Sequence, residues 1–167
     1  MQFKFKCHSC NKTHTGMPSF GADAPFSYYQ VAEAEREHRC EIGSDCCVID
    51  NTQFFVRGSL EIPVHGWQKP YTWGVWVSLS ESSFRKWEDN FDNPLRSHFE
   101  PFFGWLNTQL DLYPNTVSLK TNVHQRDGLI RPYIELEPTD HPLAVEQREG
   151  VSVDRLAQIY AHYMHES

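Results

Sequence analysis

The sequence has no run of about 20 apolar residues, the length that a membrane-spanning helix requires. Its start, Met1 to Lys6, alternates apolar and polar side chains instead of forming the apolar region of a signal peptide. We therefore expect no membrane association and a cytoplasmic location. Basic clusters are also missing, since 15 Lys and Arg face 22 Asp and Glu, which gives a net charge of -7. Affinity for nucleic acid comes mainly from Lys and Arg, so we expect no nucleic-acid partner.

No internal repeat and no low-complexity linker divides the chain, which predicts a single domain over residues 1–167. Hydrophobic residues make up 40% and aromatic residues 14%, and this ring surface needs a folded core. Within the domain we expect a metal-knuckle region with the first helix (1–50), an antiparallel sheet with an inserted helix (51–137) and C-terminal helices (138–167). The predicted class is α+β.

The predicted sheet is antiparallel, curved and about six strands wide, with helices packed on it. Within 71–79, a period of two assigns Tyr71, Trp73 and the following odd-numbered residues to the core and places Trp76 on the opposite face. Residue types and turn signals predict strands near Phe3 to Lys6, in a meander over 46–80, and at 102–109, 116–124 and 130–137. Helices are predicted at 27–39, where the helix is expected to be broken, after a Ser80 cap, within 139–150 and after a Ser152 cap.

Five cysteines cannot all pair within one chain, and the chain has no export signal, so reduced thiols fit better than a disulfide framework. Cys7 and Cys10 are separated by two residues, a spacing that lets two thiolates hold one tetrahedral metal from a single turn. Zinc is the usual ion. Ordinary thiols and a redox pair are the alternatives. A redox pair normally begins a helix, whereas 11–16 is typical of a loop.

The remaining ligands of the predicted structural zinc must come from elsewhere in the chain. The nearest donors are His8, His14, His38, Cys40, Cys46 and Cys47. Adjacent side chains of a strand point to opposite faces, so at most one of Cys46 and Cys47 should reach the ion. A set of Cys7, Cys10, Cys47 and His14 would form a site with three thiolates and one imidazole and no open position for water.

A second candidate site is a polar face of the sheet, formed by Lys120, His124, Glu135 and Glu137. Neighbouring carboxylates and a histidine could perform general acid–base chemistry, but the same pattern is typical of the solvated side of an antiparallel sheet, which we favour. The residues expected to border this face are Arg57, Glu61, Trp76 and Trp105. In the segment 139–150, His141 and Glu146 are interpreted as capping and solvent-facing groups rather than catalysts.

Several segments together resemble a bacterial family known only as a domain of unknown function. They include Cys7-His8-Ser9-Cys10, Ser19-Phe20-Gly21-Ala22-Asp23-Ala24-Pro25, Cys47-Val48-Ile49-Asp50, Phe54-Phe55-Val56-Arg57-Gly58, Trp73-Gly74-Val75-Trp76 and His141-Pro142-Leu143-Ala144-Val145-Glu146-Gln147. The resemblance implies no established activity, substrate or partner. It matches Cys7, Cys10, His14 and Cys47, and so favours Cys47 over Cys46.

The leading hypothesis is a binding or regulatory module that carries a structural zinc and recognises a protein partner through an aromatic and acidic surface. The alternative is a small hydrolase or transferase that works from Lys120, His124, Glu135 and Glu137. Whether the protein is an enzyme stays open at this point. A deep pocket around those four groups would favour the enzyme, and a flat solvated face would favour the module.

Overall fold

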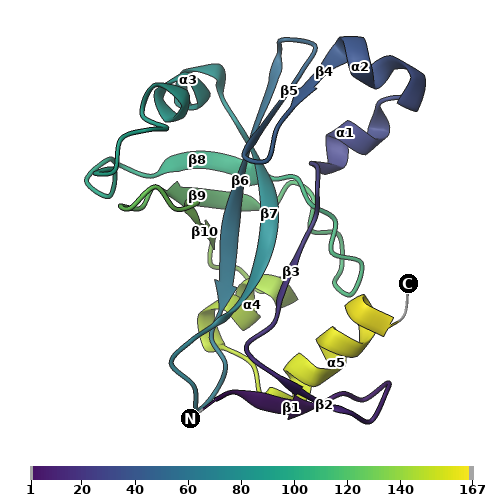
Figure 1. The fold of residues 1–167 in the computed structure, drawn as a ribbon. Helices are drawn as coiled ribbons and strands as arrows, with labels where there is room; N and C mark the ends of the chain where they lie inside the picture. The colour runs from purple at the N-terminus through teal and green to yellow at the C-terminus, as the bar shows by residue number, and fades with distance from the viewer. Residues whose placement is uncertain (1, 166–167) are drawn as a thin grey trace.

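The computed structural model describes residues 2–165, and its centre is a closed five-stranded barrel (Figure 1). Its strands are β6 (Gln53–Ile62), β7 (Tyr71–Leu79), β8 (Phe102–Leu106), β9 (Lys120–His124) and β10 (Tyr133–Leu136). Each strand pairs antiparallel with the next in chain order, and β10 returns to β6 where Tyr133 lies opposite Ser59. This last pairing is parallel because the first and fifth strands of an up-and-down series point the same way.

The prediction of a mixed helix and sheet fold is confirmed, with 25% helix and 31% strand, but the predicted simple curved antiparallel sheet of about six strands is wrong. Eight strands form the main sheet, which closes on itself and contains two parallel pairings. The extra strands are short: β3 (Ser19–Gly21) runs parallel to β7, while β5 (Cys46–Ile49) and β4 (Cys40–Ile42) extend from β6.

The sequence predicted that Trp76 borders a polar surface. The additional strands instead bury this second face of β7. The odd-numbered residues of β7, including Tyr71 and Trp73, fill the barrel core as predicted. Trp76 is fully buried in a smaller cluster on the other side, together with Phe55 and Cys47. Its indole Nε1 donates a hydrogen bond to the Ala22 carbonyl oxygen at 2.9 Å. A period of two identifies two faces of a strand but does not indicate that both are covered.

The predicted helices are present. The first is broken into α1 (Phe26–Gln30), a 3₁₀ turn (Glu33–Glu35) and α2 (Arg36–Arg39). The next is α3 (Glu81–Asp89), where the Ser80 hydroxyl accepts a hydrogen bond from the Ser83 amide as the predicted cap. The last two are α4 (Pro142–Glu149) and α5 (Val153–His165). Within 2–165, no helix has both the length and the apolar character needed to cross a bilayer.

Helix α4 covers the gap that the short parallel pairing leaves at the edge of β10. The Gln147 side chain accepts a hydrogen bond from the Leu136 amide and donates one to the Ile134 carbonyl, both at 2.8 Å. The side-chain amide thus makes the hydrogen bonds that a longer neighbouring strand would otherwise make with these two backbone groups. His141 caps α4 through Nδ1, which accepts from the Leu143 amide at 3.1 Å.

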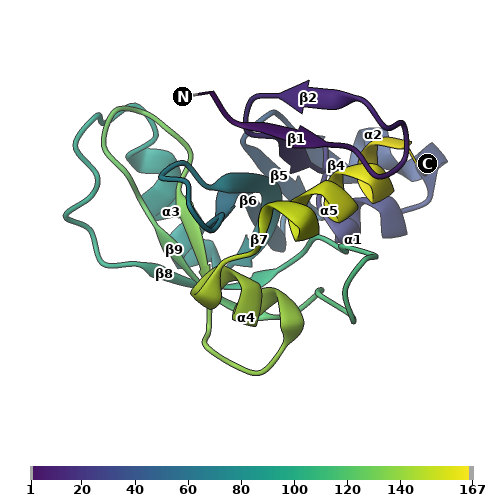
Figure 2. The same cartoon turned by 90° about the horizontal axis from the view of Figure 1, so that it is seen from below.

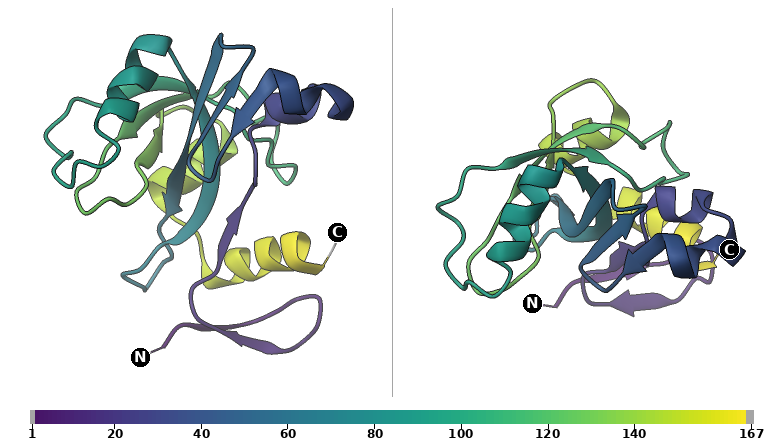
Figure 3. Two further views of the ribbon diagram at one scale, coloured as in Figure 1. Left: turned by 45° about the horizontal axis from the view of Figure 1, so that its top comes forward. Right: turned by 90° about the horizontal axis from the view of Figure 1, so that it is seen from above.

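The N-terminal strands β1 (Lys4–Lys6) and β2 (Thr13–Thr15) form a hairpin that is a separate two-stranded sheet. The hairpin lies beside α5, at the end of the barrel away from α1 and α2 (Figures 2 and 3). Phe5 of β1 faces α5, and its ring lies 5.0 Å from that of Tyr160. This packing brings the β1–β2 hairpin against the last described helix.

Candidate functional site

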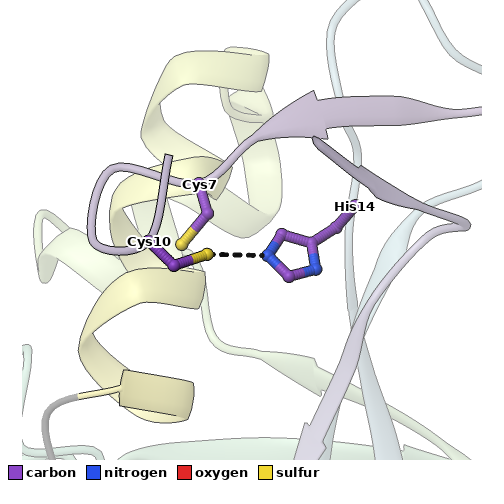
Figure 4. Close-up of side chains that lie close together, drawn as sticks. All are labelled: Cys7, Cys10 and His14. Carbon is purple, nitrogen blue, oxygen red and sulfur yellow. Dashed lines mark hydrogen bonds between the residues drawn. The ribbon is translucent and has the colours of Figure 1, made fainter. Parts of the chain in front are cut away.

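The loop between β1 and β2 carries the two cysteines in a tight turn. Cys7 follows the last residue of β1, and its amide donates to the Lys12 carbonyl at 2.9 Å, while the Asn11 amide donates back to the Cys7 carbonyl at 3.1 Å. Asn11 has a φ of 58°, a left-handed conformation that asparagine tolerates better than most residues. The turn places both sulfur atoms on the same side of the loop (Figure 4).

Cys7, Cys10 and His14 form a group whose donor atoms all lie within 4.8 Å of one another. Cys10 Sγ is 3.4 Å from His14 Nε2 (Figure 4). In a tetrahedral zinc site with Zn–S near 2.3 Å and Zn–N near 2.0–2.1 Å, the sulfur and nitrogen atoms are about 3.5 Å apart. The three side chains therefore have the spacing of metal ligands and could hold an ion, as the sequence predicted for these three residues.

The surroundings of the group lower the pKa of Cys7 and orient the ring of His14. Burial acts to raise the pKa of the Cys7 thiol, but hydrogen bonds from the backbone of Cys10 and Ser9 outweigh it, and the net pKa is lowered. The His14 ring stacks on Phe5 at 5.5 Å, and its Nδ1 is 3.4 Å from the Tyr160 hydroxyl. Such contacts to the non-ligating nitrogen orient a metal-binding histidine. Tyr160 is 146 residues from His14, so no local sequence pattern predicts this contact.

The structure does not bring Cys47 to this group, contrary to the predicted ligand set. Cys47 lies on β5 opposite Phe55 and is fully buried in the smaller core cluster, which also contains Cys40. Burial raises the pKa of Cys47 to about 12, so at neutral pH it is a protonated core thiol rather than a thiolate ligand. Burial likewise raises the pKa of the half-buried Cys46. Sequence spacing identified the three hairpin residues that lie together, but it could not show which core Cys47 would join.

Among residues 2–165, no fourth His, Cys, Asp or Glu donor lies within 4.8 Å of all three members of the group. A cavity of about 520 Å³ adjoins the group and is lined by Cys7, His8 and Asp154, among others, so water can approach it. His8 lies next to Cys7 in the loop, but its Nε2 bonds to Asp154 Oδ1 at 3.0 Å. Both of these side chains are substantially exposed, so their ion pair contributes little to stability. Asp154 was not foreseen as a neighbour, since it is 146 residues away.

The second predicted site lies on the outer face of β8, β9 and β10, as the alternation of β9 predicts. Lys120, Glu135 and Glu137 are exposed, and His124 Nε2 bonds to Glu135 Oε1 at 3.1 Å. Two shallow depressions divide these groups: one includes Lys120 and Glu137, and the other includes Glu135. His124 lines neither of them, so the four groups do not share an enclosed pocket.

The residues expected to border this face have different positions. Trp105 does border it, and Lys120 Nζ lies 6.0 Å from the centroid of its ring. Phe103 stands beside Trp105, with ring centroids 5.1 Å apart, and both side chains are exposed. By contrast, Trp76 is buried, and Arg57 lines a different groove. Glu61 accepts a hydrogen bond from Arg126 at 2.6 Å.

The contacts of His141 agree with its predicted role, whereas those of Glu146 do not. His141 caps α4, as described above, in agreement with the capping role interpreted for it from the sequence. Glu146 is not solvent-facing, since its carboxylate accepts hydrogen bonds from the Tyr113 hydroxyl at 2.5 Å and from Arg155 Nε at 2.8 Å. It thereby joins α4 to α5 and to the loop before β9.

The fold and the site define a small barrel protein with an appended hairpin that could hold a metal ion. A family model described as "Uncharacterized protein conserved in bacteria (DUF2199)" matches residues 6–151. The match spans most of the chain, so the chain belongs to this family, and the resemblance inferred from the sequence motifs is confirmed. No curated protein and no solved structure matches the chain.

Proposed function

We propose that the protein is a binding module whose N-terminal hairpin is held by a structural zinc ion at Cys7, Cys10 and His14. One observation carries the metal assignment: two thiols and one imidazole from the two ends of a single hairpin loop converge within 4.8 Å. Sulfur and imidazole nitrogen are the donors that zinc prefers in structural sites. A reoriented His8 would supply the fourth protein ligand that a closed structural site requires.

A structural role for the ion follows from the weakness of the hairpin by itself. The β1–β2 sheet has only two strands of three residues and is separate from the main sheet. An isolated two-stranded hairpin is marginally stable in water. A zinc ion would connect the loop after β1 to His14 in the middle of β2, and packing of Phe5 on Tyr160 would then attach the stabilised hairpin to α5.

The binding role is supported by the outer face of β8, β9 and β10. Phe103 and Trp105 are exposed side by side on β8, opposite Asn122 and Lys120 of β9. Aromatic side chains are enriched at protein interfaces, and this open face suits a protein partner better than an enclosed small substrate. A hydrolase or transferase at Lys120, His124, Glu135 and Glu137 is the weaker alternative because no shared pocket encloses these groups.

The metal is tested by zinc analysis of freshly purified protein that has received no added zinc. We expect about one zinc per chain in the wild type and in Cys46→Ser, which removes a half-buried thiol outside the group. Cys10→Ser should lose the ion or bind it at least 100-fold more weakly in competition with a chromophoric chelator. Zinc-free wild-type protein, or an unchanged affinity in Cys10→Ser, would disprove the site.

The partner is tested by affinity capture from the native bacterium, with and without chelator. A protein recovered by the wild type and by Leu95→Ala, an exposed apolar residue elsewhere on the surface, but lost with Trp105→Ala, supports a binding face on β8. Equal recovery by the Trp105 and Leu95 variants would remove this face from the proposal. Failure to recover any partner in repeated captures would count against the module and in favour of enzyme screening.

A further inference from the structure

A groove at the side of the barrel, away from the metal group, contains a guanidinium without a partner. The groove has a volume of about 700 Å³ and includes residues of β3, β6 and β7. Arg57 of β6 lines it; its Nε is buried, and its guanidinium makes no hydrogen bond or ion pair with another residue in 2–165. A buried donor without a partner is costly, the more so when it is charged, and such a group requires an explanation.

The floor of the groove is bare backbone, which leaves room for this guanidinium. Gly21 of β3 lies opposite Gly74 of β7, and Gly74 lies opposite Ser59 of β6, so the row across three strands carries no large side chain. A Cβ atom on Gly21 would lie 3.4 Å from Arg57 Nη2, and one on Gly74 would lie 3.7 Å from it. Arg57 Cζ is 5.7 Å from the Trp76 ring centroid. The guanidinium is thus supported by the strand row and an aromatic ring, with no side chain of the row to cover it.

The rim of the groove is apolar. Leu129 and Ile130 line it and leave 56% and 51% of their surface exposed. Leu129 has a φ of 59°, a left-handed conformation that is unfavourable for a residue with a Cβ atom. The loop therefore holds two aliphatic side chains in water beside a cation without a partner, an arrangement that suits a ligand with one anionic group and an aliphatic body.

The charges of the groove distinguish between anions. Asp45 and Asp23 both line it, and Asp45 Oδ1 already accepts a hydrogen bond from Arg131 Nε at 3.0 Å. Arg131 also lines the groove and pairs with Asp45, so it is the carboxylate of Asp23 that disfavours a dianion such as phosphate, whereas the single fork of Arg57 matches one carboxylate in bidentate geometry. We infer that this groove binds a small aliphatic carboxylate, with Arg57 on the carboxylate and Leu129 and Ile130 on the aliphatic part. The inference does not depend on the zinc proposal.

The test is an NMR titration of the full-length protein with 4-methylpentanoate, its neutral amide and inorganic phosphate as separate probes. The Arg57 Nε–H resonance is the direct readout, since a carboxylate bound at the Nη groups changes the chemical shift of this neighbouring proton. We expect a saturable shift with 4-methylpentanoate at millimolar or tighter affinity, as is reasonable for a ligand of about eight heavy atoms. Arg57→Lys keeps the charge but loses the fork, so it should weaken binding at least ten-fold, whereas Arg85→Lys on the exposed face of α3 should not.

Every other outcome overturns the inference. Equal shifts with the acid and the amide would show apolar binding that does not use Arg57. Saturation by phosphate but not by the carboxylate would assign a different ligand, and no shift of the Arg57 resonance with any probe would remove the site. Because the wild-type resonance is read directly, the result stands even if Arg57→Lys fails to fold.

Discussion

Replacing Gln147 by methionine is expected to weaken the closure of the barrel. The substitution keeps the length and approximate volume of the side chain but removes its two hydrogen bonds to backbone groups, each 2.8 Å long, to the Leu136 amide and the Ile134 carbonyl, and a longer one of 3.3 Å to the Tyr133 hydroxyl. Both β10 residues are buried, and the neighbouring parallel pairing with β6 is confined to Tyr133 and Ser59. No other strand residue is therefore placed to satisfy the two groups.

The expected cost follows from the number of groups left unpaired. A buried backbone donor or acceptor without a partner costs about 1–3 kcal/mol, so two of them cost about 2–6 kcal/mol. Partial access of water to the half-buried Gln147 position places the expectation in the lower part of this range, at about 2–4 kcal/mol. Because small domains have a stability of about 5–15 kcal/mol, the variant should still fold but unfold at clearly lower urea concentration.

Urea unfolding, followed by tryptophan fluorescence and by circular dichroism, measures this loss. Gln158→Met is the matched control, since Gln158 is exposed on α5 and should change stability by less than about 0.5 kcal/mol. Hydrogen exchange of the Leu136 amide should accelerate in Gln147→Met but not in the control. A loss below about 1 kcal/mol, with unchanged exchange at Leu136, would refute the view that α4 completes the edge of β10.

Two further predictions concern the packing of β8 and the acid limb of stability. Gly104→Ala would place a Cβ atom 2.4 Å from a valine methyl of β7 and 2.8 Å from a backbone oxygen. Calorimetry should therefore show that the free energy of unfolding falls by about 2 kcal/mol or more. In the control Gly43→Ala, a Cβ atom meets nothing within 4 Å, so stability should be nearly unchanged. Asp127 accepts hydrogen bonds from the amides of Ser97 and Arg96 and from the Ser97 hydroxyl, and these lower its pKa. The ionised Asp127 carboxylate therefore stabilises the fold above the pKa of about 3.9 that it has in the unfolded chain, and this stabilisation is lost as the pH falls through its lower pKa in the folded protein. The urea midpoint of Asp127→Asn should be lower than that of the wild type at pH 7 and should depend less on pH below about 4. Parallel pH profiles of variant and wild type would contradict this assignment.

Local features of the sequence predict most of the elements but not their closure. Alternation and turn residues locate the long strands, and Ser80 identifies the start of α3 because a cap acts on amides only three residues away. The parallel pairing of β10 with β6 depends on how many strands intervene, and β3 depends on a three-residue pairing with β7 across more than 50 residues. Such contacts are set by the assembled barrel, and no short pattern encodes them.

The candidate metal group illustrates the same limit within one site. Cys7, Cys10 and His14 belong to one hairpin, so spacing alone brings them together. Cys47 does not belong to this hairpin. It lies on β5, which places it in a different core cluster. Tyr160 meets His14 only because α5 packs on the hairpin. Residues linked by a short loop are predictable from spacing, whereas those that meet through tertiary packing are not.

The closed barrel also explains where candidate chemistry can lie in this protein. A five-stranded barrel has a narrow interior, and here Tyr71, Trp73 and Phe102 contribute to an apolar cluster that fills it. A ligand of any size must therefore be bound outside the barrel. The elements added to the five strands supply the required shape: the hairpin provides the metal group, and β3 provides the wall of bare backbone beside Arg57. The additions and the outer surface of the barrel, rather than its interior, should therefore carry the specific function of this chain.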